Sequence, residues 1–164
     1  MIIRGRVWVF GDDVNTDLMY PGFVVSLPEE ERPRYCMHAN RPGWAQQVKK
    51  GDIIVAGRNF GCGSSRPAAK SLKDLGISCV LAESINGLFL RNAVNFGLPA
   101  LALQGVTKMF REGDVAEVDI RSGEVKNVNS GESMRAKPLP EQLIKILEAG
   151  GLLPLLAKEG FLKL

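Results

Sequence analysis

The chain contains one histidine and three cysteines among its 164 residues, and this scarcity excludes several kinds of site. A Ser–His or Cys–His catalytic pair within the chain, and most metal sites, would have to use His38. Cys36, Cys62 and Cys79 form an odd set without a C-x-x-C spacing, which argues against a disulfide framework or a zinc knuckle. We therefore expect no metal site in this chain.

Long apolar runs and basic clusters are missing as well. No stretch approaches the roughly 20 apolar residues of a membrane span, and the N-terminal MIIRGRVWVF has no apolar segment long enough for a signal peptide. The net charge is only +3, and the basic residues are not interleaved with aromatic ones, which disfavours nucleic-acid binding. We expect a cytoplasmic protein that binds neither membranes nor nucleic acids.

The hydrophobic pattern predicts an α/β fold in one domain that covers residues 1–164. Short apolar runs bounded by glycine or proline alternate with segments of helical spacing. This order is that of a parallel sheet with crossover helices. It runs through a strand at 52–57, a helix at 68–75, a strand at 78–83, a helix at 85–97 and a strand at 98–103.

Other segments complete the predicted fold. Residues 2–10 alternate as a strand, and residues 114–136 alternate with breaks at Ser122-Gly123 and Ser130-Gly131, as antiparallel hairpins do. Residues 139–149 predict an amphipathic helix. Residues 19–43 contain four prolines and no periodicity, so we expect an irregular segment that is mobile without a partner.

The loop GCGSSR (61–66) lies between a predicted strand and a predicted helix, where α/β proteins commonly bind ligands. Free main-chain N–H groups at a helix start favour an anion, and Arg66 adds a planar fork suited to a carboxylate or phosphate. Ser64 and Ser65 contribute hydroxyls, while the P-loop, the dinucleotide fingerprint and the nucleophile elbow all fail to match. Two interpretations follow: a carboxylate or phosphate site, or a helix start that is merely rich in glycine.

Four segments of the chain resemble the small subunits of the aconitase-like hydro-lyases, such as those of 3-isopropylmalate dehydratase and homoaconitase. The segments are GDDVNTDLMYPG (11–22), GDIIVAG followed by NFGCGSSR (51–57 and 59–66), AESINGLFLRNAVNFGLPAL (82–101) and EAGGLLPLL (148–156). The resemblance implies a swivelling β/β/α domain like the C-terminal domain of aconitases. One departure is Pro67-Ala68, which stands where the family usually has Glu-His.

The resemblance also implies that two different chains together form the active site. A large catalytic subunit would carry a [4Fe–4S] cluster, and this chain would hold no cofactor. The complex would be a heterodimer or a heterotetramer of two large and two small chains. In this chain, Ser64 matches the family's catalytic base and Arg66 the arginine that binds a substrate carboxylate. The other substrate-binding residues that it implies are Gly63, Ser65, Thr16 and Asp17.

In members of the family, the residues at the positions that follow Pro21-Gly22 of this chain contact the variable group of the substrate. In this chain they are Phe23, Val24, Val25 and Ser26. Homoaconitase-like members tend to carry an arginine where this chain has Val25, and an apolar residue suits an apolar branch such as isopropyl. The favoured reaction is therefore the isomerisation of 3-isopropylmalate and 2-isopropylmalate in leucine biosynthesis.

Several alternatives to this substrate and this function stay open. Val24 and Val25 are equally compatible with packing in a core, and Arg32, Arg34 or Arg41 could supply the missing charge of a homoaconitase small subunit. A dimethylmalate- or citraconate-type hydro-lyase would also accept an apolar pocket. A different class of function is a non-catalytic anion-binding module with the same fold.

Overall fold

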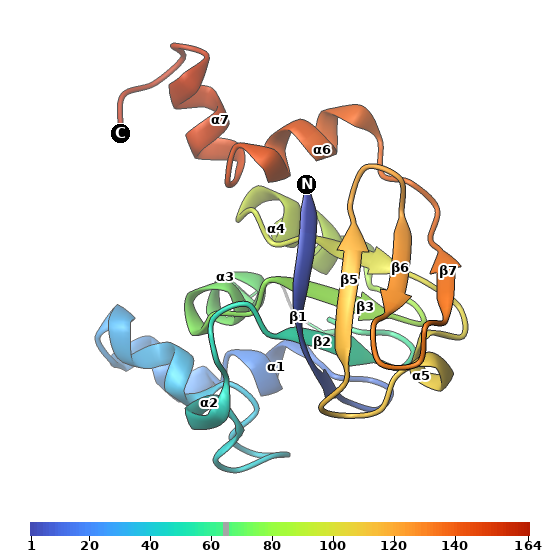
Figure 1. Ribbon diagram of the computed structural model, residues 1–164. Coiled ribbons are helices and arrows are strands. Elements are labelled where there is room, and N and C mark those ends of the chain that lie inside the picture. The colour runs from blue at the N-terminus through green and yellow to red at the C-terminus, as the bar shows by residue number, and fades with distance from the viewer. Residues whose placement is uncertain (64–65) are drawn as a thin grey trace.

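Strand β1 (Ile2–Val9) belongs to two differently built halves of one sheet. The computed structural model describes residues 1–63 and 66–164, and in these residues the strands form a seven-stranded sheet of order β4-β3-β2-β1-β5-β6-β7 (Figure 1). The last residues of β1 pair in parallel with β2, and its first residues pair antiparallel with β5. The predicted α/β class is confirmed.

The parallel half contains β1, β2 (Ile53–Ala56), β3 (Cys79–Ala82) and β4 (Ala100–Ala102). Every residue of β2 and β3 is buried, which explains why both strands appear as unbroken apolar runs in the sequence. Helix α3 (Ala68–Leu75) connects β2 to β3, and α4 (Gly87–Asn95) connects β3 to β4. The predicted alternation is confirmed, and it brings the carboxyl ends of β1, β2 and β3 to one edge of the sheet.

The antiparallel half contains β5 (Val115–Asp119), β6 (Glu124–Asn127) and β7 (Ser133–Arg135), which lie beside β1 in Figure 1. More buried and more exposed residues alternate along β5 and β6, so these strands carried a period-two signal. Gly123 and Gly131 have φ values of 79° and 82° at the two turns, a conformation that favours glycine. The predicted hairpins are confirmed.

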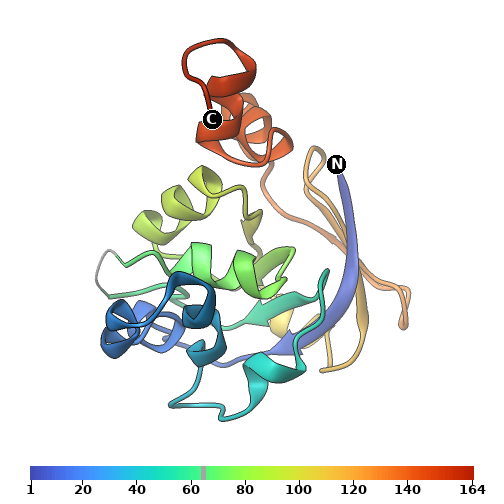
Figure 2. The same ribbon diagram turned by 90° about the vertical axis from the view of Figure 1, so that its left-hand side faces the viewer.

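The two faces of the parallel half enter separate hydrophobic cores. Residues Ile54 and Ala56 of β2 belong to a first core that includes Leu72 of α3. Residues Ile53 and Val55 belong to a second core, which the antiparallel strands and the C-terminal helices complete. In the turned view of Figure 2, helix α4 lies between α3 and the C-terminal helices, and Nζ of Lys73 on α3 donates to the carbonyl of Gly150 over 3.0 Å.

The segment predicted to be irregular contains two 3-10 helices, η1 (Gly22–Ser26) and η2 (Glu29–Tyr35). Each begins directly after a proline with an extended ψ angle, Pro21 or Pro28, and η2 includes Pro33. Such short helices with three residues per turn leave no α-helical spacing in a sequence. The remaining short helices are α1 (Thr16–Met19), α2 (Trp44–Gln47) and α5 (Val106–Met109).

The C-terminal helices are α6 (Glu141–Glu148) and α7 (Leu152–Lys158). Helix α6 buries Ile144 and Leu147 in the second core, and it begins two residues later than the predicted helix because Pro140 is its N-cap.

Among all helices in residues 1–63 and 66–164, none combines the length and the apolar character that crossing a membrane requires.

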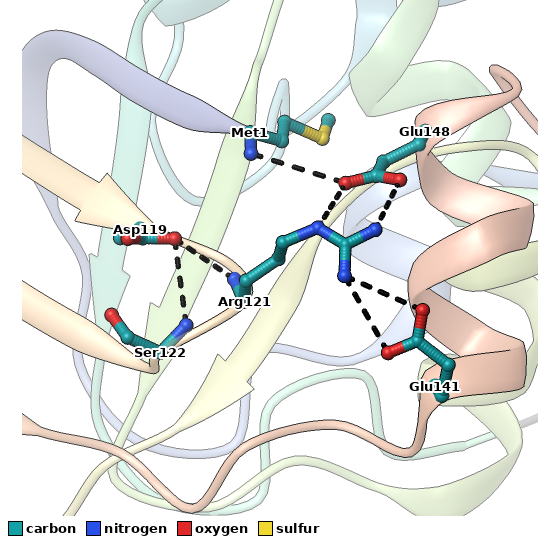
Figure 3. Close-up of polar contacts among 6 residues, drawn as sticks. All are labelled: Met1, Asp119, Arg121, Ser122, Glu141 and Glu148. Atoms are coloured by element: carbon teal, nitrogen blue, oxygen red, sulfur yellow. Dashed lines mark hydrogen bonds and ion pairs between the residues drawn. The ribbon is translucent and has the colours of Figure 1, made fainter.

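A cluster of charged groups holds α6 against the turn between β5 and β6 (Figure 3). Arg121 binds Glu148 through Nε and Nη2, at 2.8 Å each, and its Nη1 lies 3.3 Å from a carboxylate oxygen of Glu141. The N-terminal amine of Met1 lies 3.9 Å from Glu148. The hydrogen bond from Arg121 lowers the pKa of Glu148 from its ordinary value of 4.5. The first strand, the hairpin and α6 therefore meet in one ionic cluster.

We predict that Arg121→Ala lowers the melting temperature at pH 7 and that this difference shrinks in acid. The folded-state pKa of Glu148 is depressed, so its stabilising contribution is complete above its unfolded value of 4.5 and is lost as the pH falls below it. Thermal unfolding of wild type and Arg121→Ala between pH 3 and pH 7 measures this. Arg4→Ala, which removes an exposed guanidinium 3.7 Å from Glu117, is the control. A difference in melting temperature that stays constant with pH would contradict the prediction.

Candidate active site

The loops that follow β1, β2 and β3 are joined by main-chain hydrogen bonds. The N–H of Gly61 donates to the carbonyl of Val14 over 2.8 Å, and the N–H of Thr16 donates to the carbonyl of Cys62 over 2.9 Å. The 57–63 loop also forms a bridge to the loop after β3. Three of the segments that resemble the hydro-lyase family therefore form one connected surface.

Two glycines of the 57–63 loop are closely packed against their neighbours. Gly61 has a φ of 77°, and a Cβ there would lie 2.3 Å from the ring of Phe89. Gly63 has a φ of 100°, and a Cβ there would lie 3.2 Å from Oγ1 of Thr16. The glycine-rich composition of this loop is thus a packing requirement, as well as a source of accessible main chain.

Helix α1 presents its first two residues differently. Oδ1 of Asn15 caps the helix by accepting a hydrogen bond from the N–H of Leu18 over 3.0 Å. Thr16 is buried, with 4% of its surface exposed, and it lies against Gly63. The Asp17 side chain is 63% exposed and points away from the core. The predicted T-D pair therefore offers one packed hydroxyl and one accessible carboxylate.

Arg66 lies against α1 and the residues that follow it. Its Nε is 2.8 Å from Oδ1 of Asp17, and its Nη1 donates to the carbonyl of Tyr20 over 3.3 Å. A Cβ on Gly22 would lie 3.3 Å from the same Nη1. The side chain of Arg66 remains one-third exposed. A guanidinium held from two sides, with part of its surface accessible, is suited to binding an anion.

Sequence reasoning brought together four residues that the structure also brings together: Gly63, Arg66, Thr16 and Asp17. It missed Tyr20, because a main-chain acceptor leaves no signal in the sequence. Ser64 and Ser65 lie outside the described residues. Helix α3 begins at Ala68, with Pro67 as its N-cap, so the departure from the family pattern falls at the start of this helix.

The residues predicted to contact the variable group of the substrate are Phe23, Val24, Val25 and Ser26, called the specificity loop below. They differ in how far they are exposed. Val24 is fully buried in the first core, whereas Phe23 and Val25 are 53% and 62% exposed. The hydroxyl of Ser26 donates to the carbonyl of Phe23 over 2.8 Å, which closes the turn. Val24 therefore anchors η1, and the apolar side chains that a ligand or partner could reach are Phe23 and Val25.

The arginines that could replace a charge at Val25 differ in their surroundings. Arg41 donates to the carbonyl of Val9 over 3.2 Å, binds Glu112 at 2.7 Å and lies over the ring of Trp8. This places it beside β1 and gives it a structural role there. Arg32 lies beside the specificity loop, and its contacts are described below.

The cysteines do not form a set that could bind an iron–sulfur cluster. Cys36 and Cys79 are buried in different cores, and burial raises the pKa of both thiols, that of Cys79 to about 12. Cys62 in the glycine loop is partly exposed. In the part of the chain that the structure describes, no three His, Cys, Asp or Glu side chains gather as metal ligands would. The donor set of this chain does not fit a cluster.

Comparisons with known proteins agree on one family. A family model described as the aconitase C-terminal domain matches residues 16–105. The small subunit 1 of 3-isopropylmalate dehydratase from Methanopyrus kandleri is 47% identical over 161 residues, which are 97% of this chain and 95% of that protein. The methanogen homoaconitase small subunit of Methanothermobacter thermautotrophicus is 46% identical over 153 residues, 92% of this chain and 88% of its own.

A solved structure shows the same fold. The crystal structure of 3-isopropylmalate dehydratase from Methanocaldococcus jannaschii superposes with a TM-score of 0.89 and 38% sequence identity. The superposition covers 97% of this chain and 95% of that one. Together with the family match, it confirms the predicted swivelling-domain fold.

We predict that Gly61→Ala lowers the free energy of unfolding by about 3 kcal/mol, because the new methyl group would meet the Phe89 ring in a backbone conformation that already disfavours alanine. Gly131→Ala is the matched control, since its φ of 82° is similar and no atom lies within 4 Å of the added Cβ. It should cost about 1 kcal/mol. Urea denaturation of both variants measures the difference, and equal losses would contradict the packing role of Gly61.

Proposed function

The chain belongs to the aconitase C-terminal domain family, and we propose on this basis that it is the small subunit of a two-subunit hydro-lyase. The proposed reaction is the isomerisation of 3-isopropylmalate and 2-isopropylmalate through a dehydrated intermediate, a step of leucine biosynthesis. We further propose that residues 1–164 form a single swivelling domain and that the protein acts in the cytoplasm.

The observation that carries this proposal is the held guanidinium of Arg66 beside the glycine loop. The contacts of Arg66 with Asp17 and with the carbonyl of Tyr20 fix its direction before any ligand binds. A substrate carboxylate that binds this guanidinium would be held next to the loop that carries Ser64. Preorganised positive charge of this kind stabilises the negative charge that builds up when a proton leaves the carbon next to a carboxylate.

We assign to Ser64 the role of the base. The C–H bond beside the carboxylate breaks, its proton moves to the serine oxygen, and its electron pair forms the C=C bond as the neighbouring C–O bond breaks and hydroxide leaves. Re-addition of the proton and of hydroxide to the opposite carbons gives the isomer. A serine can act in this way only as an alkoxide, which needs a strongly anion-stabilising environment. Arg66 and the main-chain N–H groups of the loop would provide that environment, together with Ser65 and Gly63, which would line the anion site.

The other half of the active site would come from a large subunit. We propose that this partner carries a [4Fe–4S] cluster, which would supply Lewis-acid chemistry at the leaving hydroxyl. The buried thiols of Cys36 and Cys79 support placing the cluster outside this chain. This chain would then bind the carboxylate and move the proton, and it would be inactive alone.

The exposed residues of the specificity loop support an apolar branched substrate. Phe23 and Val25 present apolar side chains, and Arg41, one candidate for a compensating charge, is engaged beside β1. The similarity to a homoaconitase small subunit keeps that activity as the second candidate. A non-catalytic anion-binding module is the third, and it would bind dicarboxylates without turnover when the large subunit is present.

We predict that Ser64→Ala lowers kcat about 10²- to 10⁴-fold in the reconstituted complex, because the proton acceptor is lost. The complex is formed with the large subunit after its cluster has been reconstituted, and the absorbance of the unsaturated intermediate is followed with 3-isopropylmalate as substrate. Ser133→Ala on the exposed strand β7 is the control and should keep wild-type rates. Turnover of Ser64→Ala at the wild-type rate would show that another group is the base.

We predict that Val25→Arg shifts the ratio of kcat/KM values toward cis-homoaconitate by about 10- to 100-fold, because the new guanidinium can pair with a distal carboxylate. The exposure of Val25 leaves room for the larger side chain. Val25→Leu, which keeps the position apolar, should retain the preference for 3-isopropylmalate over cis-homoaconitate and citraconate. An unchanged ratio for Val25→Arg would remove the support for this residue as a specificity determinant.

A further inference from the structure

Arg32 of η2 reaches back to the specificity loop and contacts one residue within it and one residue on each side of it. Its Nε donates to the carbonyl of Leu27 over 3.1 Å, and its Nη2 donates to the carbonyl of Val25 over 3.3 Å. Its Nη1 donates to the hydroxyl oxygen of Tyr20 over 3.3 Å. One guanidinium therefore connects residues on both sides of η1.

The specificity loop has few other constraints. Helix η1 is a short 3-10 helix, and its own main-chain hydrogen bonds run from Val24 to the carbonyl of Pro21 and from Leu27 to that of Val24. The hydroxyl of Ser26 adds one to the carbonyl of Phe23. Val24 is its one buried residue. A pocket of about 230 Å³ lies between η2 and α3, with Tyr20 and Arg32 in its lining. The hydrogen bonds of Arg32 therefore add to a short helix that has one buried anchor.

Helix η2 is anchored in turn, so Arg32 has a fixed base. Oε1 of Glu29 lies 2.8 Å from Nζ of Lys70 on α3, and the ring of Tyr35 meets that of Phe23 edge-on with centroids 5.1 Å apart. Hydrogen bonds to Asp74 and Glu29 raise the pKa of Lys70, so it stays charged at neutral pH. The chain of contacts runs from the helix after Arg66 to η2 and then to the specificity loop.

We propose that Arg32 is a positioning residue that holds the specificity loop in its substrate-reading conformation. The inference rests on the proposed function for the identity of the substrate. Arg32 acts through the carbonyls of Val25 and Leu27 and through the hydroxyl of Tyr20. These three contacts set where the exposed side chains of Phe23 and Val25 lie. The competing role for Arg32 is direct pairing with a substrate carboxylate, which would require it to leave these contacts.

Arg32→Lys separates the two roles. Lysine keeps the positive charge, but its three donors sit on one nitrogen, so it lacks the extended planar fork with which Arg32 reaches two carbonyls and a hydroxyl in different directions. If Arg32 positions the loop, Arg32→Lys and Arg32→Ala should both raise KM for 3-isopropylmalate about tenfold and change kcat by less than about threefold. The preference for 3-isopropylmalate over citraconate should also fall about tenfold. Arg4→Ala, on the part of β1 that pairs with β5, should match wild type. Wild-type KM and preference in Arg32→Lys would overturn the proposal.

A second measurement does not depend on the substrate. In the isolated chain, amide hydrogen exchange of the peptide that covers residues 22–27 should become about tenfold faster in Arg32→Ala. Arg34→Ala removes a guanidinium from the same short helix without touching the three contacts, so its exchange should match wild type. Unchanged exchange in Arg32→Ala would overturn the proposal. If the wild-type complex fails to turn over 3-isopropylmalate while exchange rises as expected, the proposed function fails and the positioning role stands.

Tyr20→Phe provides a milder variant in case Arg32→Ala does not fold. It removes only the hydroxyl that accepts from Nη1 of Arg32 and keeps the ring, which is 8% exposed. Exchange of the 22–27 peptide should rise by about threefold, between wild type and Arg32→Ala. Circular dichroism confirms folding in each case. Wild-type exchange in a folded Tyr20→Phe variant, together with wild-type kinetics of Arg32→Lys, would overturn the positioning role.

Discussion

The main-chain hydrogen bonds between the loop after β1 and the loop after β2 are the contacts on which the candidate site depends. Thr16 donates to Cys62 and Gly61 donates to Val14, so the two loops are held at hydrogen-bond distance over several residues. Gly63 packs closely against Thr16 of the first loop, and Gly61 packs against the ring of Phe89 on α4. Once the loops are joined, Arg66 comes within reach of Asp17, a residue that precedes it by 49 positions in the chain.

The shared strand β1 makes this junction possible. Its parallel half places the end of β1 beside the end of β2, and the loops therefore leave the sheet in the same direction. Its antiparallel half ties the same strand to β5, and the Arg121 cluster adds α6 (Figure 3). The site therefore lies at the end of a strand that pairs in parallel with β2 there and antiparallel with β5 at its start.

Sequence patterns predicted the elements that bury regular faces and missed those that do not. Strands β2 and β3 and helices α3 and α4 each carry an apolar run or a helical spacing, and all were predicted. Helices η1 and η2 have too few turns to show a hydrophobic period in the sequence. They begin after Pro21 and Pro28, and η2 also contacts α3.

Within the site, the residue types of Thr16 and Asp17 carried no signal of their own, and only the family resemblance linked them to the glycine loop. The Arg32 contacts were missed because main-chain carbonyls are invisible in a sequence.

The two arginines at the edges of the specificity loop divide its tasks. Arg66 contacts the carbonyl of Tyr20 just before the loop, and Arg32 contacts carbonyls within and just after it. In the described residues, Arg66 therefore meets the chain before the loop, whereas Arg32 reaches the end that carries Val25 and also donates to the hydroxyl of Tyr20. A substrate would be held by its shared carboxylate at the first end and distinguished by its variable group at the second. Under the proposed function, a substitution at position 25 would therefore change the end that meets the variable group and leave the contacts of Arg66 with Asp17 and Tyr20 in place.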